Sequence, residues 1–384
     1  MAEAAKAGRQ EGEIVRVAKG KTGAATVARW LHQVRAKHGR GYLAQVWDLL
    51  RYRLSVQRVD PLEYYEFKLY EPARREDAKR RPYVGMKSRG LLAARINNLL
   101  WAAVGDDKLV TYALMHGLGH AAPRVYAIHH PWRTHGDAAA LPDRAALERH
   151  LRQGMPYPFF GKPVDASSGT GVAAVLAYEA ATDSLVFPGD RRMTVPAFAG
   201  VAGHFLRRGY MFLELLRPHP AIAELCGDRV CTLRLMLLRD AGRVSVQAAV
   251  WKIAVGLNMA DNNQFGGNAM TGVDPATGRI GRVVTGNGPD EVELTVHPDT
   301  GRPFAGFVLP DFQAAVDLCI RASLAFPGLP WQGWDVALTP AGPVIVELNT
   351  ASGLTLAQHA LGHGLMTDRF ARLLRQPRPR LRYR

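Results

Sequence analysis

Three oxygen-bearing side chains near the C-terminal end of the chain have the types and spacing of a magnesium site. Asp335 belongs to one short apolar run, and Glu347 and Asn349 belong to the next, with a Pro-Ala-Gly turn between the two runs. Such a pattern is typical of a β-hairpin. A hairpin centred on Ala341 places Asp335 directly opposite Glu347, because the two residues lie equally far from the turn.

The expected hairpin gives these side chains a common face. Directly opposed residues have Cβ atoms about 4.5–5.5 Å apart, a separation at which like charges repel, and a divalent cation would remove that repulsion. Because side chains alternate along a strand, Asn349 shares the face of Glu347, whereas Val344, Val346 and Leu348 would cover the other face. Two carboxylates and an amide form a hard-oxygen site that suits Mg²⁺ bound to phosphates. The alternative is an ordinary hairpin with a solvent-facing polar side.

Basic side chains upstream have the spacing of a phosphate-binding set. Lys108 begins a predicted helix, where a positive charge is unfavourable next to the helix dipole and a bound anion would compensate it. Lys162 lies on a predicted strand that leads into a Gly-rich turn, whose backbone N–H groups could approach a phosphate closely. Taken alone, the turn is also typical of a flexible connection. It consists of Ser167, Ser168, Gly169, Thr170 and Gly171.

Two further cations and one acid lie within apolar strands. Arg234 lies in a leucine-rich segment, and Lys252 lies in the apolar segment that follows. Glu214 is embedded in YMFLELL, where a buried carboxylate needs a donor or a cation. A structural ion pair is the plain alternative for a single Arg in a strand. Together with the carboxylate hairpin, the cations favour phosphoryl chemistry, whose transition state requires positive groups and Mg²⁺ around the transferring oxygens.

The elements that must position these residues divide the chain into a helical head and an α/β body. Two segments of the head have helical periodicity and predict amphipathic helices packed on a core. From residue 106 onward, short β-rich runs alternate with helices. The periodic residues are Val27, Trp30, Leu31 and Val34 in one segment, and Leu43, Val46, Trp47, Leu50 and Leu54 in the other. The expected divisions are a mainly helical region at 1–105, a smaller α+β unit at 106–212, a larger one at 213–368 and a solvated, Arg-rich tail at 369–384.

The composition is that of a globular protein with unevenly distributed charge. The 384 residues carry a formal net charge of +15, and the excess lies at the ends. Residues 1–105 hold 21 Lys and Arg against 10 acids, and residues 369–384 hold seven Arg and no acid. Without exposed aromatics interleaved among the basic residues, we expect no specific nucleic-acid partner. The basic ends could contact an anionic surface peripherally.

The sequence also restricts the location and the metal chemistry. No run reaches the ~18 apolar residues of a membrane span, and the first residues lack a signal-peptide core, so we expect no transmembrane segment and a cytoplasmic location. Cys226, Cys231 and Cys319 lack zinc-site spacing and predict reduced, partly buried thiols.

Taken in order along the chain, these motifs resemble the ATP-grasp superfamily, and within it the sugar-transfer-associated branch related to glutamate ligases. The similarity extends over about 105–365. The superfamily pattern comprises Asp107-Lys108, Phe160–Pro163, the Gly-rich turn, Glu214 and the D…E-x-N set of Asp335, Glu347 and Asn349. The branch pattern comprises His219-Pro220, Thr232–Arg234, Asp261-Asn262, Gly266-Gly267, VDPATG and GWDVAL.

The resemblance implies an ATP-grasp fold, in which two α+β subdomains clasp ATP, and it implies roles for individual residues. Lys108 and Lys162 would contact the ATP phosphates, and residues 167–171 would cover them. Residues 213–216, including Glu214 and Leu216, would meet adenine. Arg234 and Lys252 would hold the γ-phosphate or an acyl phosphate, although this branch more often has Arg at the second position. The implied magnesium ligands are Asp335, Glu347 and Asn349, and the implied substrate contacts are His219, Asn262, Gly266 and Gly267.

The reaction implied is an ATP- and Mg²⁺-dependent ligation of a small-molecule carboxylate to an amine through an acyl phosphate, with release of ADP and phosphate. One alternative is an ATP-grasp kinase that phosphorylates a hydroxyl of a sugar or peptide. Another is a non-catalytic ATP-binding protein, against which the intact D…E-x-N set argues. The sequence does not indicate the substrates or the oligomeric state.

Overall fold

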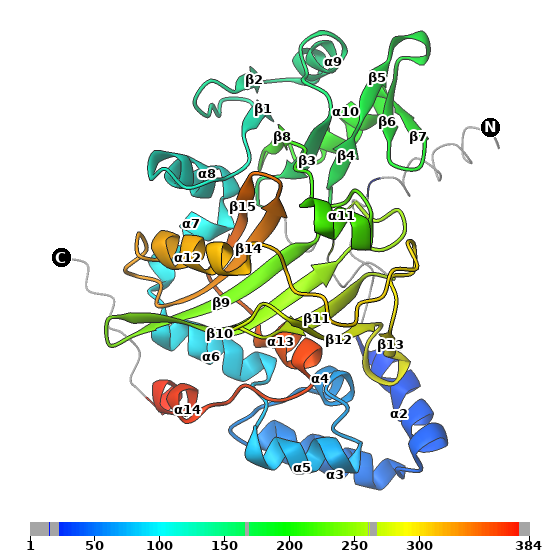
Figure 1. Cartoon of the computed structure of the whole chain (residues 1–384), viewed down its shortest axis with the longest axis vertical. Coiled ribbons are helices and arrows are strands. Elements are labelled where there is room, and N and C mark those ends of the chain that lie inside the picture. The colour runs from blue at the N-terminus through cyan, green and yellow to red at the C-terminus, as the bar shows by residue number, and fades with distance from the viewer. Residues whose placement is uncertain (1–14, 16–22, 166–168, 260, 262–266, 376–384) are drawn as a thin grey trace.

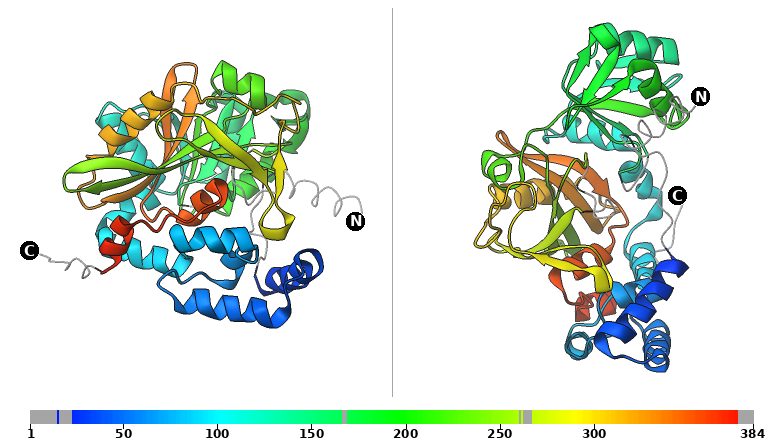
Figure 2. Two further views of the ribbon diagram at one scale, coloured as in Figure 1. Left: turned by 60° about the horizontal axis from the view of Figure 1, so that its bottom comes forward. Right: turned by 90° about the vertical axis from the view of Figure 1, so that its right-hand side faces the viewer.

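The structure, a computed structural model, describes residues 15, 23–165, 169–259, 261 and 267–375. Its elements form three parts that follow one another along the longest axis (Figure 1). We call them the head (24–106), the small lobe (108–214) and the large lobe (220–375). Figure 2 shows, in its right-hand view, the large lobe between the other two.

The head is helical, as the sequence predicts, and has a core rich in aromatic residues. Trp30 and Val34 are buried there beside Tyr64, Tyr65 and other aromatic side chains. A highly charged segment of the head forms α5. The helices are α2 (Ala24–His38), α3 (Tyr42–Leu54), α4 (Pro61–Glu66), α5 (Pro72–Arg80) and α6 (Met86–Ile96), followed by η1 (Leu99–Trp101) and α7 (Ala102–Asp106).

The second periodic segment of the head forms the expected helix, α3, with the opposite orientation. Its apolar residues Leu43, Val46, Trp47, Leu50 and Leu54 are exposed. Its buried residues are Gln45, Asp48 and Tyr52. The prediction that this apolar stripe packs on the core is therefore wrong, because hydrogen-bonded polar groups fix the other side of the helix inward.

The small lobe contains a five-stranded and a three-stranded sheet. The larger sheet has the order β2-β1-β8-β3-β4 and is antiparallel except for the β1–β2 pair. Helix α8 packs on one face of it, and α9 and α10 pack on the other. Its strands are β1 (Val125–His129), β2 (Ala139–Leu141), β3 (Phe159–Pro163), β4 (Ala173–Val175) and β8 (Tyr210–Glu214). The remaining elements are α8 (Lys108–Gly117), α9 (Arg144–Gln153), β5 (Ala177–Glu179), η2 (Ala180–Thr182), β6 (Ser184–Phe187), β7 (Arg191–Thr194) and α10 (Val195–Gly203).

The large lobe is a seven-stranded antiparallel sheet in the order β13-β12-β11-β10-β9-β14-β15. One face packs against α11 and α12, and the other packs against α13, α14 and residues of the head. The strands are β9 (Thr232–Asp240), β10 (Arg243–Ile253), β11 (Ala269–Val273), β12 (Ile280–Thr285), β13 (Val292–Leu294), β14 (Trp331–Thr339) and β15 (Gly342–Asn349). The helices are α11 (Pro220–Cys226), η3 (Gly288–Asp290), α12 (Phe312–Ser323), α13 (Leu354–Leu361) and α14 (Asp368–Arg375).

The expected solvated tail begins as a packed helix. Within α14, Phe370 is 1% exposed, and Arg369 donates to Asp240 at 2.8 Å. An apolar anchor and a charge partner therefore hold residues that composition alone assigns to solvent. Residues 376–384 lie outside the described residues.

Two other expectations concern the cysteines and the membrane. Cys226, Cys231 and Cys319 are free and buried, as expected. Throughout the described part of the chain, every helix is too short or too polar to cross a bilayer.

Candidate functional site

The β14–β15 hairpin places the two acids as the sequence predicts. Asp335 lies directly opposite Glu347, and Gly333 lies opposite Asn349. A register shift follows Asp335, so that the pairing nearer the turn is displaced by one residue. The turn is therefore the two residues between Thr339 and Gly342 instead of a turn centred on Ala341.

The register shift is a β-bulge, and it corrects the predicted alternation. Val346 has no directly opposed partner, so Ile345 and Leu348 both enter the core, with 0% and 2% of their surface exposed. Val344 and Val346 stay half-buried instead of covering the core face. A bulge adds one residue to one strand and re-aims the side chains beyond it. Here it directs Glu347 away from the core.

A row of charges crosses three adjacent strands of the large sheet. Arg234 on β9 lies opposite Asp335 on β14, which lies opposite Glu347 on β15. The Arg234 guanidinium donates from Nε and Nη2 to the two Asp335 carboxylate oxygens, each at 2.6 Å. Lys252 Nζ donates to Asp335 Oδ2 at 3.1 Å and pairs with Asp261 Oδ1 at 3.3 Å.

The charges in this row shift one another's titration. Burial alone would raise the pKa of Asp335, but Arg234 and Lys252 outweigh it and hold that pKa well below its usual range. Burial would likewise lower the pKa of Lys252, and the carboxylates of Asp261 and Asp335 raise it instead. Arg234, Lys252 and Asp335 thus remain charged because they face one another.

Two lysines of the small lobe reach the same hairpin. Lys162 on β3 donates to the Tyr112 hydroxyl at 2.8 Å, and Tyr112 donates to the backbone carbonyl of Val346 at 2.7 Å. Lys108 Nζ, at the start of α8, lies 3.4 Å from Glu347 Oε1. The bulged carbonyl and the Glu347 carboxylate therefore connect the small lobe with the large lobe.

Lys162 differs from Lys252 in the direction of its pKa shift. Burial lowers its pKa to about 8, against the opposing influence of Glu347 and Asp335. A lysine poised in this way gains charge when an anion approaches, since a nearby negative charge favours its protonated form.

The start of α8 is capped from within the protein. Asp107 accepts hydrogen bonds from the backbone N–H groups of Leu109 and Val110 and pairs with Arg133 at 2.8 Å. The dipole penalty expected for Lys108 is therefore offset by an acidic N-cap.

The Gly-rich turn is only partly within the described residues. Ser167 and Ser168 lie outside them, whereas Gly169, Thr170 and Gly171 connect β3 to β4. Gly169 and Gly171 have φ of +69° and +73°, a left-handed region that favours glycine. The Tyr210 hydroxyl donates to the Gly171 carbonyl at 2.9 Å and fixes the end of the turn.

The segment between the lobes holds the predicted adenine contacts. Glu214 ends β8 half-buried, and its carboxylate accepts from the backbone N–H of Arg124 at 3.2 Å. Leu216 lies half-buried in the link that follows. His219 caps α11 by accepting from the Ala221 N–H at 3.2 Å, so its ring serves the helix start.

The predicted substrate loop is described only at its edges. Asn262 and Gly266 lie outside the described residues, and Gly267 has a φ of +91°. Asp261, which precedes Asn262 in the chain, accepts hydrogen bonds from the Thr232 backbone N–H and hydroxyl, both at 2.5 Å. This contact ties the loop to the start of β9.

Sequence reasoning did not assign site roles to Tyr112 and Asp261. Tyr112 links Lys162 to the hairpin, and Asp261 holds Lys252. The signal for Tyr112 was available, because it lies one helical turn after Lys108 and therefore on the same face. Asp261 belongs to the branch pattern, but its contact with Lys252 could be found only from the structure.

The residues expected to bind magnesium fit such an ion by their chemistry. Asn349 lies two residues after Glu347 on β15, and its amide oxygen is a hard-oxygen ligand of the kind that Mg²⁺ takes. Asp335 Oδ1 accepts one hydrogen bond, so a lone pair remains on it. Among the described residues no three His, Cys, Asp or Glu side chains gather as a metal site, so the set depends on the amide as its third ligand.

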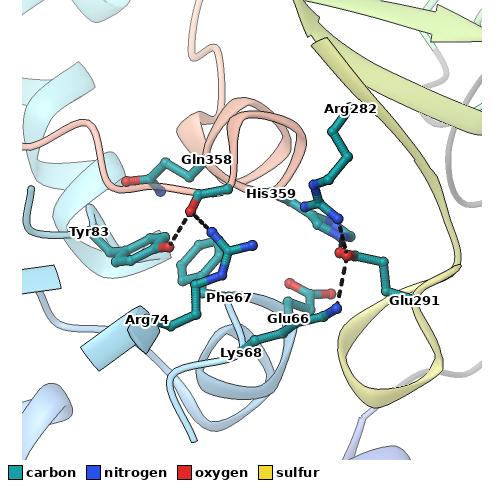
Figure 3. A pocket seen from close by; sticks show the side chains of 10 residues that line it. Glu66, Phe67, Lys68, Arg74, Tyr83, Arg282, Glu291, Gln358 and His359 are labelled. Carbon is teal, nitrogen blue, oxygen red and sulfur yellow. Dashed lines mark hydrogen bonds and ion pairs between the residues drawn. The ribbon is translucent and has the colours of Figure 1, made fainter. Parts of the chain in front are cut away.

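A second polar cluster lies between the head and the large lobe and shares no residue with the charged row. Glu291 accepts from Lys68, Arg282 and His359 at 2.9, 2.7 and 2.6 Å (Figure 3). The cavity beside it is about 10 Å³, about the room for one water molecule. The cavity is too small for a nucleotide, and Glu291 already has three partners. The cluster therefore joins the head to the large sheet.

Comparisons with known proteins agree with this architecture. Residues 89–372 match the model of a family described as sugar-transfer associated ATP-grasp. No curated protein matches the chain. Similar solved structures include the ATP-grasp ligase PsnB complexed with a minimal precursor (15% identity, TM-score 0.38, covering 73% of this chain and 64% of that one). Another is the VanG D-Ala:D-Ser ligase from Enterococcus faecalis (14% identity, TM-score 0.41, covering 72% of this chain and 64% of that one).

The chain spans less than two thirds of the length of these two solved structures. The family match takes in the small lobe, the charged row and the hairpin, and covers most of the chain. The resemblance seen in the motifs is thereby confirmed, and the protein belongs to the sugar-transfer-associated ATP-grasp family.

Proposed function

We propose that the protein is an ATP- and Mg²⁺-dependent ligase that joins a carboxylate to an amine. The observation that carries this proposal is that Lys162 and Lys108 of the small lobe contact the hairpin that carries Asp335 and Glu347. Lys162 lies 3.5 Å from the Val346 carbonyl, and Lys108 lies 3.4 Å from Glu347. Cations from one lobe and carboxylates from the other thus border a single place, as transfer of a phosphoryl group requires.

We assign the nucleotide to the space between the lobes. Lys108 and Lys162 would bind its phosphates, and residues 167–171 would cover them. Glu214 and Leu216 would border the adenine. Asp335, Glu347 and Asn349 would hold Mg²⁺, which when bound would supply positive charge to neutralise the phosphates.

In the first proposed step, an oxygen of the substrate carboxylate attacks the γ-phosphorus of ATP, and the bond to the bridging oxygen of ADP breaks. Arg234 and Lys252 both pair with Asp335 at this site, so they would lie beside the transferring oxygens and orient them. In the second step, the amine nitrogen attacks the acyl carbon and expels phosphate, and the nitrogen loses a proton to water. His219, Asn262, Gly266 and Gly267 are the proposed substrate contacts.

A small molecule that carries the carboxylate, and a second that carries the amine, are the proposed partners. The acyl phosphate must be shielded from water between the two steps, which suits a site enclosed by two lobes. We further propose a cytoplasmic location, since the reaction consumes ATP.

The strongest alternative is a kinase that uses the same nucleotide site. It would transfer the phosphate to a hydroxyl and would release ADP without free phosphate. The favoured reaction is the ligase, because buried cations at Arg234 and Lys252 suit an anionic carboxylate better than a neutral hydroxyl.

Mass spectrometry of the products separates the two reactions. The full chain is incubated with ATP, Mg²⁺ and panels of amino acids, amino sugars and carboxylic acids, with ¹⁸O in the carboxyl group. A ligase yields an amide, ADP and phosphate that has gained one ¹⁸O from the carboxylate. A phosphorylated product without free phosphate would establish the kinase, and amide formation without ¹⁸O transfer would exclude the acyl phosphate.

A further inference from the structure

Helix α3 presents an apolar face to solvent at the end of the molecule that lies opposite the small lobe (Figure 1). Leu43 is 88% exposed, Leu54 is 84% exposed and Trp47 is 69% exposed. Val46 and Leu50 are exposed between them. These five side chains recur at the i, i+3, i+4, i+7 spacing of one helical face. An apolar stripe of this kind on a helix surface normally faces a core or a partner.

The orientation of α3 is fixed by the polar residues on its opposite side. Asp48 is buried and accepts from Arg40 at 2.7 Å and from the Tyr64 hydroxyl at 2.9 Å. Gln45 is buried as well and accepts from the Tyr65 hydroxyl at 2.8 Å. A rotation of α3 that buried its apolar face would leave these polar groups unpaired, which is costly. The exposed stripe is therefore a stable property of the fold.

Positive charge flanks the stripe on both sides. At about 100° per residue, Arg51 and Arg53 project about 80° to either side of the centre of the apolar face. Both are exposed. Residues 24–59 contain seven Lys and Arg and one acid, which is the buried and paired Asp48. The exposed charged side chains of α3 itself are therefore all basic.

This pattern distinguishes between possible occupants of the face. Two copies of the chain that met through α3 would bring their arginine-flanked faces together, and like charges would oppose the contact. An anionic bilayer, which has an apolar interior and negatively charged headgroups, matches both the apolar stripe and the flanking arginines. Amphipathic helices with Leu and Trp on one face and Arg beside it bind to the headgroup region of bilayers in this way.

We propose that α3 docks the protein on an anionic lipid bilayer. Leu43, Trp47 and Leu54 would enter the boundary between headgroups and acyl chains, while Arg51 and Arg53 would contact the anionic headgroups. The lobes would then project away from the bilayer, because they lie on the other side of the head (Figure 2).

Co-sedimentation of the full chain with vesicles tests this proposal. Vesicles of phosphatidylcholine alone are compared with vesicles that also contain phosphatidylserine. We expect binding to the anionic vesicles, at least tenfold weaker binding for the triple variant Leu43→Ser/Trp47→Ser/Leu54→Ser, and about tenfold weaker binding for Arg51→Gln/Arg53→Gln. The matched control is Trp132→Ser, because Trp132 is 80% exposed on the small lobe, and it should bind like the wild type.

A second measurement guards against a misfolded variant. Phosphatidylcholine with brominated acyl chains, mixed with phosphatidylserine, should quench part of the tryptophan fluorescence of the wild type. This quenching should be lost in Trp47→Phe, which keeps an apolar ring and should still bind. The proposal is overturned if the wild type does not bind the anionic vesicles, or if the triple variant binds as well as the wild type. It is equally overturned if α3 substitutions abolish only self-association in light scattering.

Discussion

At the residue scale, Asp335 and Glu347 border one place but differ in what the fold requires of them. The Asp335 side chain is 3% exposed and is held by two cations, whereas that of Glu347 is 27% exposed and has one longer ion pair. Removing one member of a buried ion pair leaves an uncompensated charge, which costs far more than losing a partly exposed pair. Stability and metal binding can therefore be separated by substitution.

The first prediction concerns this separation. Asp335→Asn should lower the free energy of unfolding by about 3–5 kcal/mol, because Arg234 and Lys252 lose their shared partner. Glu347→Gln should lower it by less than about 1 kcal/mol. Urea unfolding at neutral pH measures both. Equal losses in the two variants would mean that Asp335 does not neutralise the buried cations.

A second prediction follows from the lowered pKa of Lys162. Burial holds that pKa at about 8, below the 10.5 of a free lysine, so part of the Lys162 population is neutral above pH 8. Bound ADP would favour the charged form, so binding should take up a proton between about pH 8 and 10.5, and affinity should fall as the pH rises above 8. Titration calorimetry in buffers of different ionisation enthalpy measures this uptake.

The control for that experiment is Lys162→Arg, which keeps its positive charge across the whole range. It should bind ADP without the proton uptake seen in the wild type. The same uptake in both proteins would assign it to another group. Without ADP, the lowered pKa of Lys162 also affects folding. Between about pH 8 and 10.5 the unfolded chain binds more protons at this lysine than the folded chain does, so the free energy of unfolding should rise with pH.

At the scale of elements, the sequence predicts the pairing of Asp335 with Glu347 but not the bulge beside it. Alternation and a turn determine which residues oppose each other, and both could be recognised. The bulge at Val346 could not be recognised, because it depends on the contacts that Tyr112 and Lys162 of the other lobe make with the Val346 carbonyl. The orientation of α3 was missed for a similar reason, since tertiary hydrogen bonds to Gln45 and Asp48 decide it.

A third prediction concerns the turn between β3 and β4. Gly171 has a φ of +73°, and a Cβ there would lie 2.7 Å from the Phe205 ring and 2.8 Å from Pro163. Gly119 has a φ of +71° but nothing within 4 Å. Gly119→Ala should cost about 1–2 kcal/mol from the backbone alone. Gly171→Ala should cost at least about 1 kcal/mol more because of the clash.

Thermal unfolding of the two glycine variants compares them directly, and ADP binding gives a second measure. Gly171→Ala should also weaken ADP binding, because the strained turn is the proposed phosphate cover, whereas Gly119→Ala should not. If both variants lose the same stability and bind ADP equally, the turn has room for a side chain and the proposed close approach to phosphate is wrong.

At the scale of the whole molecule, the head is joined to the large lobe through the loop that contains η3. Arg29, Trp30 and Gln33 of α2 donate to Asp290. Lys68 donates to the adjacent Glu291 (Figure 3). Burial would raise the pKa of Glu291, but His359, Arg282 and Lys68 outweigh it and lower that pKa. Glu66, which borders the same cavity, has a pKa raised to about 7 by burial and by the Glu63 and Asp60 carboxylates.

The fourth prediction tests this junction. Glu291→Gln removes a carboxylate whose side chain is 2% exposed and which pairs with Lys68, Arg282 and His359, so the free energy of unfolding should fall by about 3–5 kcal/mol. Limited proteolysis should then cleave within residues 24–106 before it cleaves the lobes. Glu293→Gln is the control, because the Glu293 side chain is 58% exposed and 4.0 Å from Arg282. Similar digestion of the two variants would contradict a junction centred on Glu291.

The central claim is that Glu347, with Asp335 and Asn349, holds Mg²⁺ together with the phosphates of the nucleotide. The most direct test is the affinity for ADP, measured by calorimetry with and without Mg²⁺, in the wild type and in Glu347→Gln. Mg²⁺ should tighten ADP binding at least tenfold in the wild type and about twofold or less in the variant. Metal-free binding should be no weaker in the variant, because the substitution removes a negative charge beside Lys108. If Mg²⁺ tightens binding equally in both proteins, the metal lies elsewhere and the proposed site is wrong.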